Sequence, residues 1–254
     1  MWKRGPRCSL RSRPWKPGVD AMAKLITLRD VYKIYGEGLE SEVRALDGVS
    51  LDIERGEFVA VVGQSGSGKS TMMNVLGCLD IPTRGEYLLD GTDVQELTDK
   101  ELSLIRNKQI GFIFQQYNLI QSLTVLENVE LPLIYQGINA DDRYDMAMEA
   151  LERVGLAGRV KHRPTEMSGG QQQRVAIARA IATKPPIIMA DEPTGALDSR
   201  TGQEVLKFLQ QLNKEGSTVI LITHDNGIAA TARRIVRLQD GKIVEDHEQE
   251  VDWL

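Results

Sequence analysis

Four short apolar runs along the chain are each followed at once by a residue that can bind a ligand. The runs and the residues after them are Phe58–Val62 before Gly63, Ile110–Phe114 before Gln115, Ile187–Ala190 before Asp191, and Val219–Thr223 before His224. Strands that are apolar at nearly every position belong to parallel sheets buried on both faces. Ligands of such sheets bind outside the carboxyl ends of the strands. The pattern therefore predicts an α/β fold with a mostly parallel core sheet and a site at one of its edges.

Other regions have patterns of their own. Leu25–Tyr35 and Leu46–Ile53, followed by a polar turn, predict an N-terminal antiparallel β subdomain. Apolar positions at helical spacing recur between about 117 and 168 and predict an inserted α-helical subdomain. The further expected elements are a strand and turn at Gly85–Gly91, helices at 168–183 and Thr201–Leu212, and a last strand and turn at Ile235–Val244.

The first 21 residues differ from the rest of the chain. They are basic, show no periodicity and lack the apolar h-region of a secretory signal. Because strand-like sequence begins only at Leu25, we predict that residues 1–21 are a disordered, dispensable extension and that Met22 is the natural start. Residues 22–254 then form one domain that carries the helical insertion.

Charge and cysteine content narrow the function classes. Residues 1–23 hold six Lys or Arg and one Asp, so the remaining residues sum to −10 although the whole chain is −5. An acidic body argues against a nucleic-acid groove. Cys8 and Cys78 lack metal-like spacing and fit a reducing cytosol. No apolar run approaches the ~20 residues of a transmembrane helix, so a membrane role would come through a separate chain.

A glycine-rich loop joins the first apolar run to a helix-prone run, Lys69–Leu79. The loop residues are Gly63, Gln64, Ser65, Gly66, Ser67, Gly68, Lys69, Ser70 and Thr71. Glycines let the backbone N–H groups approach anionic oxygens, and the helix N-terminus adds partial positive charge. Lys69 would reach the β- and γ-phosphates and the Ser70 hydroxyl would ligate Mg²⁺. The alternative is a glycine-rich turn with a surface lysine; the strand before the loop and the helix after it favour the phosphate cradle.

The other three strand ends supply groups for hydrolysis at the same edge. Asp191 would hold Mg²⁺, directly or through water, and Glu192 could orient or deprotonate the attacking water. The carbonyl of Gln115 can ligate the metal or the water, and His224 could hydrogen-bond the γ-phosphate or the water. Any one of these residues alone is more often part of a turn or structural. Their occurrence together at the strand ends carries the interpretation.

Two features are ambiguous from the residues alone. Ser168 and Gln171 have the spacing of a capping box, and Gly169 and Gly170 would make the helix N-terminus a second anion site, yet this one lacks a lysine. It is either an ordinary capped helix or a contact to a nucleotide whose main cradle is elsewhere. Tyr35 precedes a polar, glycine-containing loop, where it could stack on a purine ring or simply occupy a sheet face.

Taken in order, residues 24–246 resemble an ATP-binding-cassette (ABC) ATPase, which is a P-loop NTPase. The matching segments are Tyr35 at the A-loop aromatic, Gly63–Thr71 at the Walker A loop, Gln115 at the Q-loop, Ser168–Gln171 at the signature motif, Ile187–Asp191 at the Walker B strand, Glu192 at the catalytic glutamate, Ala196–Asp198 at the D-loop and His224 at the switch histidine. Met167 stands where the signature usually has leucine. The resemblance implies ATP and Mg²⁺ as cofactors and ATP hydrolysis as the activity.

The resemblance also implies two partners. In the family, two cassettes pair head to tail, and each signature helix closes over ATP held by the other cassette's Walker A loop. The second anion site would then serve the nucleotide of a second copy of this chain. A membrane permease subunit would hold the protein in the cytoplasm, at the inner face of the cell membrane. No nucleic-acid partner is expected.

Three stretches, 111–119, 127–133 and 193–198, are most similar to the branch that drives macrolide-export and lipoprotein-release type permeases. That branch also includes peptide-antibiotic detoxification systems. Two alternatives stay open: a division-type ABC ATPase that regulates cell-wall hydrolysis without transport, and a soluble ABC ATPase that acts on ribosomes or DNA. The soluble class usually carries two cassettes, zinc modules or long coiled coils, which the sequence lacks.

The residues that follow Gln115 are unusually apolar for a short surface segment. They are Tyr117, Leu119, Ile120, Leu123 and Leu126. We predict that 117–135 is the docking surface for the membrane partner, with a small core inside the helical subdomain as the alternative for any one residue.

Overall fold

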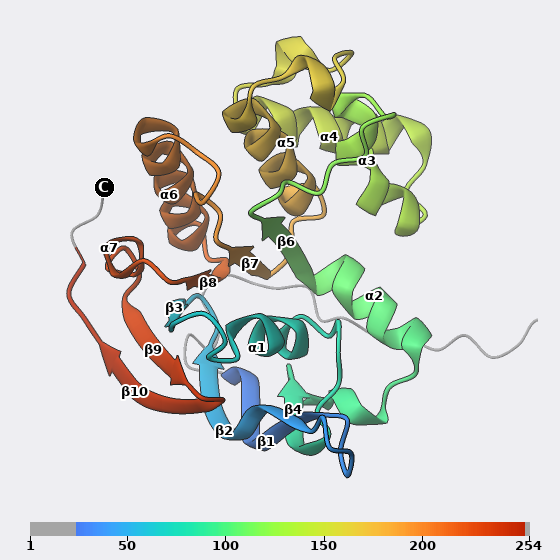
Figure 1. The fold of residues 1–254 in the computed structure, drawn as a ribbon. Helices are drawn as coiled ribbons and strands as arrows, with labels where there is room; N and C mark the ends of the chain where they lie inside the picture. The colour runs from blue at the N-terminus through green and yellow to red at the C-terminus, as the bar shows by residue number, and fades with distance from the viewer. Residues whose placement is uncertain (1–23, 252–254) are drawn as a thin grey trace, which may run out of the picture.

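The computed structural model describes residues 24–251. The predicted extension at 1–21 and the predicted start at Met22 lie outside these residues. The fold is the α/β arrangement that the apolar runs predict, with a mostly parallel central sheet and an antiparallel sheet beside it (Figure 1).

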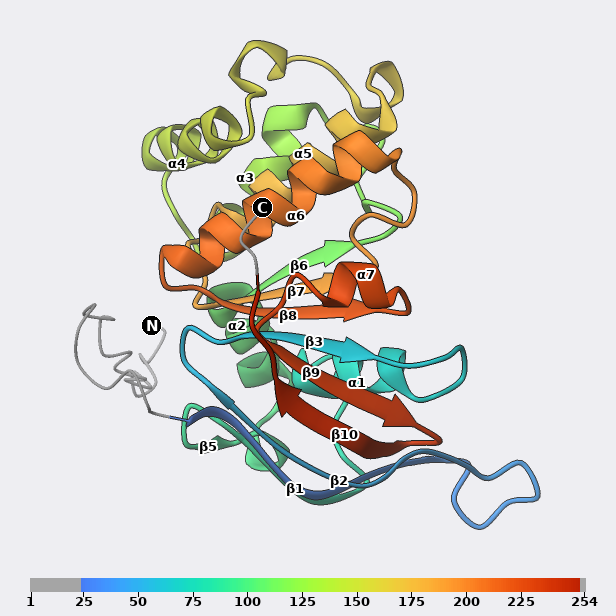
Figure 2. The same ribbon diagram turned by 90° about the vertical axis from the view of Figure 1, so that its left-hand side faces the viewer.

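The central sheet has six strands in the order β10-β9-β3-β8-β7-β6. Their bounds are β3 Phe58–Val62, β6 Ile110–Phe114, β7 Ile187–Asp191, β8 Thr218–Thr223, β9 Arg234–Gln239 and β10 Lys242–Glu248. All neighbours are parallel except β10, which pairs antiparallel with β9. Because every residue of β3 and β8 is buried, these strands form the middle of the sheet and their carboxyl ends meet at one edge (Figure 2).

The smaller sheet has the order β2-β1-β4-β5 and is antiparallel throughout. Its strands are β1 Lys24–Tyr35, β2 Val43–Glu54, β4 Arg84–Leu89 and β5 Thr92–Asp93. It shares one apolar core with a face of the central sheet, helix α1 (Lys69–Leu76) and helix α2 (Asp99–Gln109). In Figure 1 this sheet lies below helix α1, the helix that follows the glycine loop.

The opposite face of the central sheet is covered by helices in a second core. The remaining helices are α3 Val125–Tyr135, α4 Ala140–Arg153, α5 Gly169–Ile181, α6 Ser199–Lys214 and α7 Asn226–Ala229, with 3₁₀ turns at Val94–Glu96, Ala157–Arg159 and Pro164–Glu166. Helices α3 and α4 lie between β6 and β7 in the chain and pack on α5. Thr124, Asn139 and Ser168 cap α3, α4 and α5, so each begins at an N-cap side chain.

The sequence patterns misplace a few boundaries. Helix α1 ends at Leu76, three residues before the expected Leu79, because Gly77 leaves the helical conformation (φ −80°, ψ 3°) and Cys78 has a positive φ of 53°. The expected last strand is a hairpin, since Asp240 and Gly241 adopt positive φ of 49° and 76° between β9 and β10. Helix α2 was not predicted, because Leu102 is its only fully buried apolar residue.

Candidate functional site

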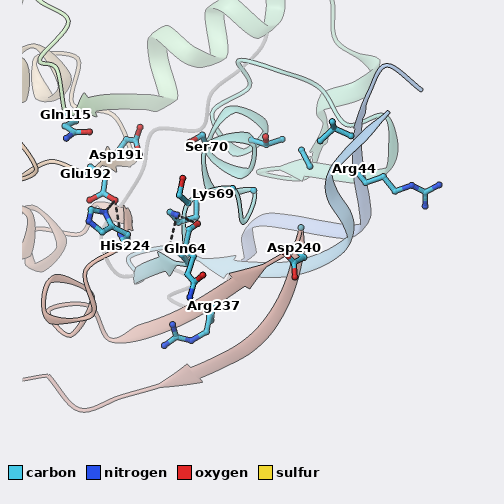
Figure 3. A pocket seen from close by; sticks show the side chains of 18 of the residues that line it. Arg44, Gln64, Lys69, Ser70, Gln115, Asp191, Glu192, His224, Arg237 and Asp240 are labelled. Atoms are coloured by element: carbon cyan, nitrogen blue, oxygen red, sulfur yellow. Dashed lines mark hydrogen bonds and ion pairs between the residues drawn. The ribbon is translucent and has the colours of Figure 1, made fainter. Parts of the chain in front are cut away.

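A cavity of about 1060 Å³ lies at the carboxyl ends of the central strands (Figure 3). The predicted site residues that line it are Gly63, Gln64, Ser65, Gly66, Gly68, Lys69, Ser70, Thr71, Gln115, Asp191, Glu192 and His224. They come from the ends of β3, β6, β7 and β8. The fold therefore brings together the groups that follow the four apolar runs.

The glycine loop lies against neighbouring backbone. An added Cβ would lie 2.3 Å from the Leu238 carbonyl oxygen at Gly63 and 2.4 Å from the Ala45 carbonyl oxygen at Gly68, where φ is +102°. Only glycine fits at these two positions. Ser67 is buried beneath the loop, 5% exposed, so its hydroxyl does not reach the cavity.

Helix α1 points its N-terminus into the cavity without a side-chain cap, since its N-cap is Gly68. The first N–H groups of the helix are therefore left for an anion. The Lys69 ammonium curls back over the loop and donates to the Gly63 and Gln64 carbonyl oxygens at 2.7 and 2.8 Å. Uncapped N–H groups and a lysine at one point make a cradle for phosphate.

Glu192 is held by the end of β8. The Thr223 hydroxyl donates to one carboxylate oxygen at 3.1 Å, and the His224 backbone N–H donates to the other at 2.8 Å. The His224 Nδ1 lies 2.5 Å from that second oxygen. Glu192 itself has a positive φ of 44°, a conformation that non-glycine residues adopt only under constraint. The Glu192 carboxylate is 14% exposed, whereas the imidazole is 70% exposed.

Asp191 is the carboxylate beside it. Burial raises the pKa of Asp191, the negative charge of Glu192 raises it further, and Lys69 lowers it. A cation would relieve this crowding of negative charge. Asp191, the Ser70 hydroxyl and the Gln115 amide supply oxygen ligands in one cavity, which suits Mg²⁺ because that ion needs few protein ligands. No cluster of three or more His, Cys, Asp or Glu that could hold a metal occurs between residues 24 and 251.

The raised pKa of Asp191 gives a stability prediction. Below the ordinary pKa of 3.8 the side chain is neutral in both states, and its contribution to stability falls as the pH rises through the higher folded pKa. Asp191→Asn should therefore raise the Tm of the nucleotide-free protein at pH 7.5, by at most about 3 °C in a chain of this size, while removing stabilisation by Mg-ATP.

Differential scanning fluorimetry without nucleotide or divalent cation measures this effect. Asp198→Asn is the control. The hydrogen bond from the Thr201 backbone N–H lowers the pKa of Asp198, so this substitution should lower the Tm instead of raising it. A lower Tm for Asp191→Asn than for the unmodified protein would contradict the assignment.

Gln115 lies against Gly195, which the sequence reasoning did not single out. A Cβ added at Gly195 would lie 2.7 Å from the Gln115 amide nitrogen. The missed lining residues are Val43, Arg44, Ala45, Asn226, Arg237, Asp240 and Gly241. They come from the start of β2, from α7 and from the β9–β10 hairpin, and no local motif marks them. Of these, Arg44 points away from Lys69 and Asp191 (Figure 3).

The signature residues and Asp198 do not line this cavity. The Ser168 hydroxyl accepts from the Gln171 backbone N–H at 3.4 Å, and the Gln171 side chain accepts from the Ser168 N–H at 3.0 Å. The capping box is therefore present. Asp198 caps α6 and accepts from the Thr201 N–H at 3.0 Å. Both helix starts lie together, since a Cβ on Gly170 would lie 2.5 Å from the Thr201 methyl.

Tyr35 also lies outside the cavity lining. It is 42% exposed, and its hydroxyl lies 3.1 Å from Asp80 Oδ2. The Lys33 ammonium lies 5.2 Å from the centre of its ring. Tyr35 on β1 pairs with Val43 on the neighbouring strand β2, and Val43 does line the cavity. The Tyr35 ring therefore lies on the strand next to the site.

Comparison with known proteins identifies the family. The family model described as "ABC transporter" matches residues 46–195, which include the glycine loop, Gln115, Asp191 and Glu192. The chain belongs to the ABC transporter family. The resemblance read from the motifs is confirmed, and the fold is that of an ABC ATPase cassette.

Relatives and solved structures agree with this family. "Macrolide export ATP-binding/permease protein MacB" of Hyphomonas neptunium is 54% identical over 222 residues, 87% of this chain and 34% of that protein. An uncharacterized ABC transporter ATP-binding protein of Thermotoga maritima is 51% identical over 87% of this chain and 94% of its own. The chain thus spans about a third of the MacB relative and nearly all of the Thermotoga one.

A dimeric post-hydrolysis structure of the ATP-binding cassette MJ0796, bound to ADP and Pi, has a TM-score of 0.82 and 47% identity. The match covers 89% of this chain and 100% of MJ0796. The chain is therefore an ABC ATPase, its nucleotide is ATP, and the predicted activity is confirmed.

Proposed function

We propose that this ABC ATPase pairs head to tail with a second copy on ATP and drives a membrane permease of the export type. One observation carries the pairing. The phosphate cavity and the signature residues Ser168–Gln171 belong to the same chain, yet the signature residues do not line that cavity. In a twofold pair, each signature helix and each Asp198 can serve the nucleotide of the other copy. The dimeric structures of MJ0796 support this arrangement.

In each of these sites, which both copies would form together, different residues have different roles. Residues Gly63–Thr71 hold the phosphates, and the Lys69 ammonium moves from the loop carbonyls to the β- and γ-phosphates. Ser70, Gln115 and Asp191 would hold Mg²⁺, which when bound would neutralise developing negative charge. Tyr35 lies one strand from the cavity and could stack on the adenine after a change of side-chain rotamer.

Glu192 takes a proton from the attacking water. Its carboxylate is aimed by the Thr223 hydroxyl and the His224 N–H, so a base is present in a fixed position. The more exposed His224 imidazole is then available to the γ-phosphate. Gel filtration of Glu192→Gln tests the pairing, with a dimer expected in ATP and a monomer in ADP.

An apolar groove of about 660 Å³ supports a permease partner. It runs between α2, α3, α5 and β6, the last strand of the sheet, where the Phe112 and Phe114 rings are stacked with centroids 5.6 Å apart. Its rim includes Leu104 and Tyr135, which are 37% and 78% exposed. An exposed apolar surface of this kind fits an apolar helix end of a membrane protein.

We propose a docking surface that replaces part of the predicted range 117–135. Leu119 is 8% exposed and belongs to the core with Val125 and Val129, so it is a core residue. The docking surface is formed instead by α2, β6 and the later part of α3, and only Asn118, Leu131, Pro132 and Tyr135 of the predicted range line it.

Export is the favoured task. A relative with more than half of its aligned residues identical is named as an ATP-binding/permease protein of macrolide export. This name favours export over the division-type alternative. None of the helices between residues 24 and 251 is long and apolar enough to cross a membrane. The proposed permease partner would hold the protein in the cytoplasm, at the inner face of the membrane.

Leu104→Ser combined with Tyr135→Ser should break this docking. Both side chains are already exposed, so the basal ATPase rate and the Tm should stay unchanged, while capture of the co-expressed permease should fall at least tenfold. Pull-down on the tagged permease measures the loss. Tyr144→Ser is the matched control, because Tyr144 is 47% exposed on α4 but lies outside the groove. Equal capture by the double variant and the control would contradict the groove as the docking site.

A further inference from the structure

The two residues that follow Gln115 and Gln116 have an unusual backbone. Tyr117 and Asn118 have φ of +59° and +49°, so two consecutive non-glycine residues lie in the left-handed region. Such a conformation persists only where surrounding contacts impose it. The contact that imposes it comes from another element, helix α5.

Arg179, near the end of α5, donates to both carbonyl groups of this turn. Its Nη2 lies 2.9 Å from the Tyr117 oxygen and its Nη1 lies 2.6 Å from the Asn118 oxygen. Burial lowers the pKa of Arg179. In residues 24–251 no carboxylate forms an ion pair with it. The rigid guanidinium fork is therefore used to hold two main-chain oxygens, and a lysine could not reproduce its geometry.

The same turn also touches the other end of α5. A Cβ added at Gly169 would lie 2.7 Å from the Tyr117 hydroxyl oxygen, so Tyr117 packs closely against this glycine. Gly169 is the first residue of the helix and part of the signature motif. The turn after Gln115 is thus fixed to α5 at the signature end through Tyr117 and at the far end through Arg179.

The turn also borders both functional surfaces of the chain. Gln115 lines the nucleotide cavity, whereas Asn118 and Arg179 line the apolar groove between α2 and α3. Any partner that fills the groove would contact the turn or the arginine that holds it. A displacement of Gln115 by nucleotide would move the same turn from the other side.

We propose that Arg179 is a positioning residue that joins the turn 115–118 to helix α5, so that nucleotide at Gln115 or a partner in the groove shifts the signature residues of the same chain. The second half of this inference rests on the proposed head-to-tail pairing. Arg179 touches no reacting atom. It sets where Gly169 and Gly170 stand when they meet the other copy's ATP.

Hydrogen–deuterium exchange tests the first half. In Arg179→Gln the amides of Asn118 and Ile120 should exchange at least tenfold faster, because the turn is released. The control Arg174→Gln lies on the same helix and removes only an ion pair with Glu204; its exchange in this turn should not change. Unchanged exchange in Arg179→Gln would overturn the inference. If that variant does not fold, Arg179→Lys replaces it and should exchange faster in this turn than the unmodified protein, because an ammonium cannot hold both carbonyl oxygens as the guanidinium does. Exchange equal to that of the unmodified protein would count against the proposal.

ATP-driven dimerisation tests the second half, with each variant placed on Glu192→Gln. Fluorescent ATP should bind the monomer with a Kd within twofold of the parent, whereas the ATP concentration for half dimerisation should rise at least tenfold. Parallel loss of both would show a folding role only, and unchanged dimerisation would show that the turn does not reach the signature; either result overturns the coupling. If the Glu192→Gln parent itself stays monomeric, the pairing fails, and the exchange result still decides whether Arg179 holds the turn.

Discussion

Glu192→Gln should bind ATP normally, hydrolyse it about 10²–10⁴-fold more slowly, and remain a dimer in ATP. Glutamine keeps the size of the side chain and one oxygen to accept from the His224 N–H, while its amide NH₂ can donate to the Thr223 hydroxyl that donates to Glu192. It removes the base that takes the proton from water. It also removes one negative charge from beside the triphosphate, which favours the ATP-bound state.

The dimer should persist because its added contacts depend on the γ-phosphate. Ser168 and the N–H groups of Gly169 and Gly170 have no phosphate to bind once hydrolysis and phosphate release have occurred. Gel filtration should therefore show a dimer with ATP and a monomer with ADP, whereas the unmodified protein should return to monomer as ATP is consumed. Phosphate release assays on the same samples give the rate.

The control for this experiment is Glu152→Gln, an exposed carboxylate on α4 that makes the same chemical change away from the cavity. It should leave both rate and oligomeric state unchanged. A Glu192→Gln variant that turns over at the parent rate, or stays monomeric in saturating Mg-ATP, would show that Glu192 is not the base.

The sequence predicts the site well where local chemistry decides the structure. Strands that are apolar at nearly every position belong to a parallel sheet covered on both faces, and the carboxyl ends of parallel strands lie at one edge of the sheet. The residues after Val62, Phe114, Ala190 and Thr223 are therefore expected to meet there. The glycine loop is likewise local, because its shape depends on adjacent residues.

Features that depend on distant contacts could not be read from the sequence. Val43 and Arg237 enter the cavity lining because separate sheets fold against each other. Leu119 is buried although it sits in a segment that looks like exposed surface, because it belongs to the same core as Val125 and Val129 of α3. Arg179 looks like any basic residue on an exposed helix face, and only its two carbonyl contacts reveal a different role.

The place of the signature residues is undetermined for a different reason. Ser168 has a complete capping box within one chain, so nothing local indicates a ligand. A site divided between two copies gives each chain half of the contacts. Variants that damage either the phosphate cavity or the signature residues, and leave the other intact, therefore test most sharply whether the site is shared between two copies.

Lys69→Ala should lose tight ATP binding and stay monomeric with any nucleotide. A hydrogen bond to a charged group contributes about 1.5–3 kcal/mol, so loss of the ammonium should raise the Kd for ATP at least about tenfold. In the nucleotide-free protein Lys69 already donates to the Gly63 and Gln64 carbonyl oxygens. The phosphates replace these two carbonyl oxygens as partners of Lys69. Only the difference in free energy between the bonds to phosphate and the bonds to the carbonyl oxygens therefore contributes to the affinity for ATP.

Ser168→Arg is the matched variant, because it blocks the signature helix and leaves the chain's own cavity untouched. It should bind fluorescent ATP like the unmodified protein and yet fail to dimerise or hydrolyse. Lys69→Ala should fail at all three steps. Anisotropy titration gives the Kd, and gel filtration gives the oligomeric state. If Ser168→Arg weakened ATP binding by the monomer as much as Lys69→Ala does, Ser168 would act on its own chain's nucleotide, and the head-to-tail division of the site would be wrong.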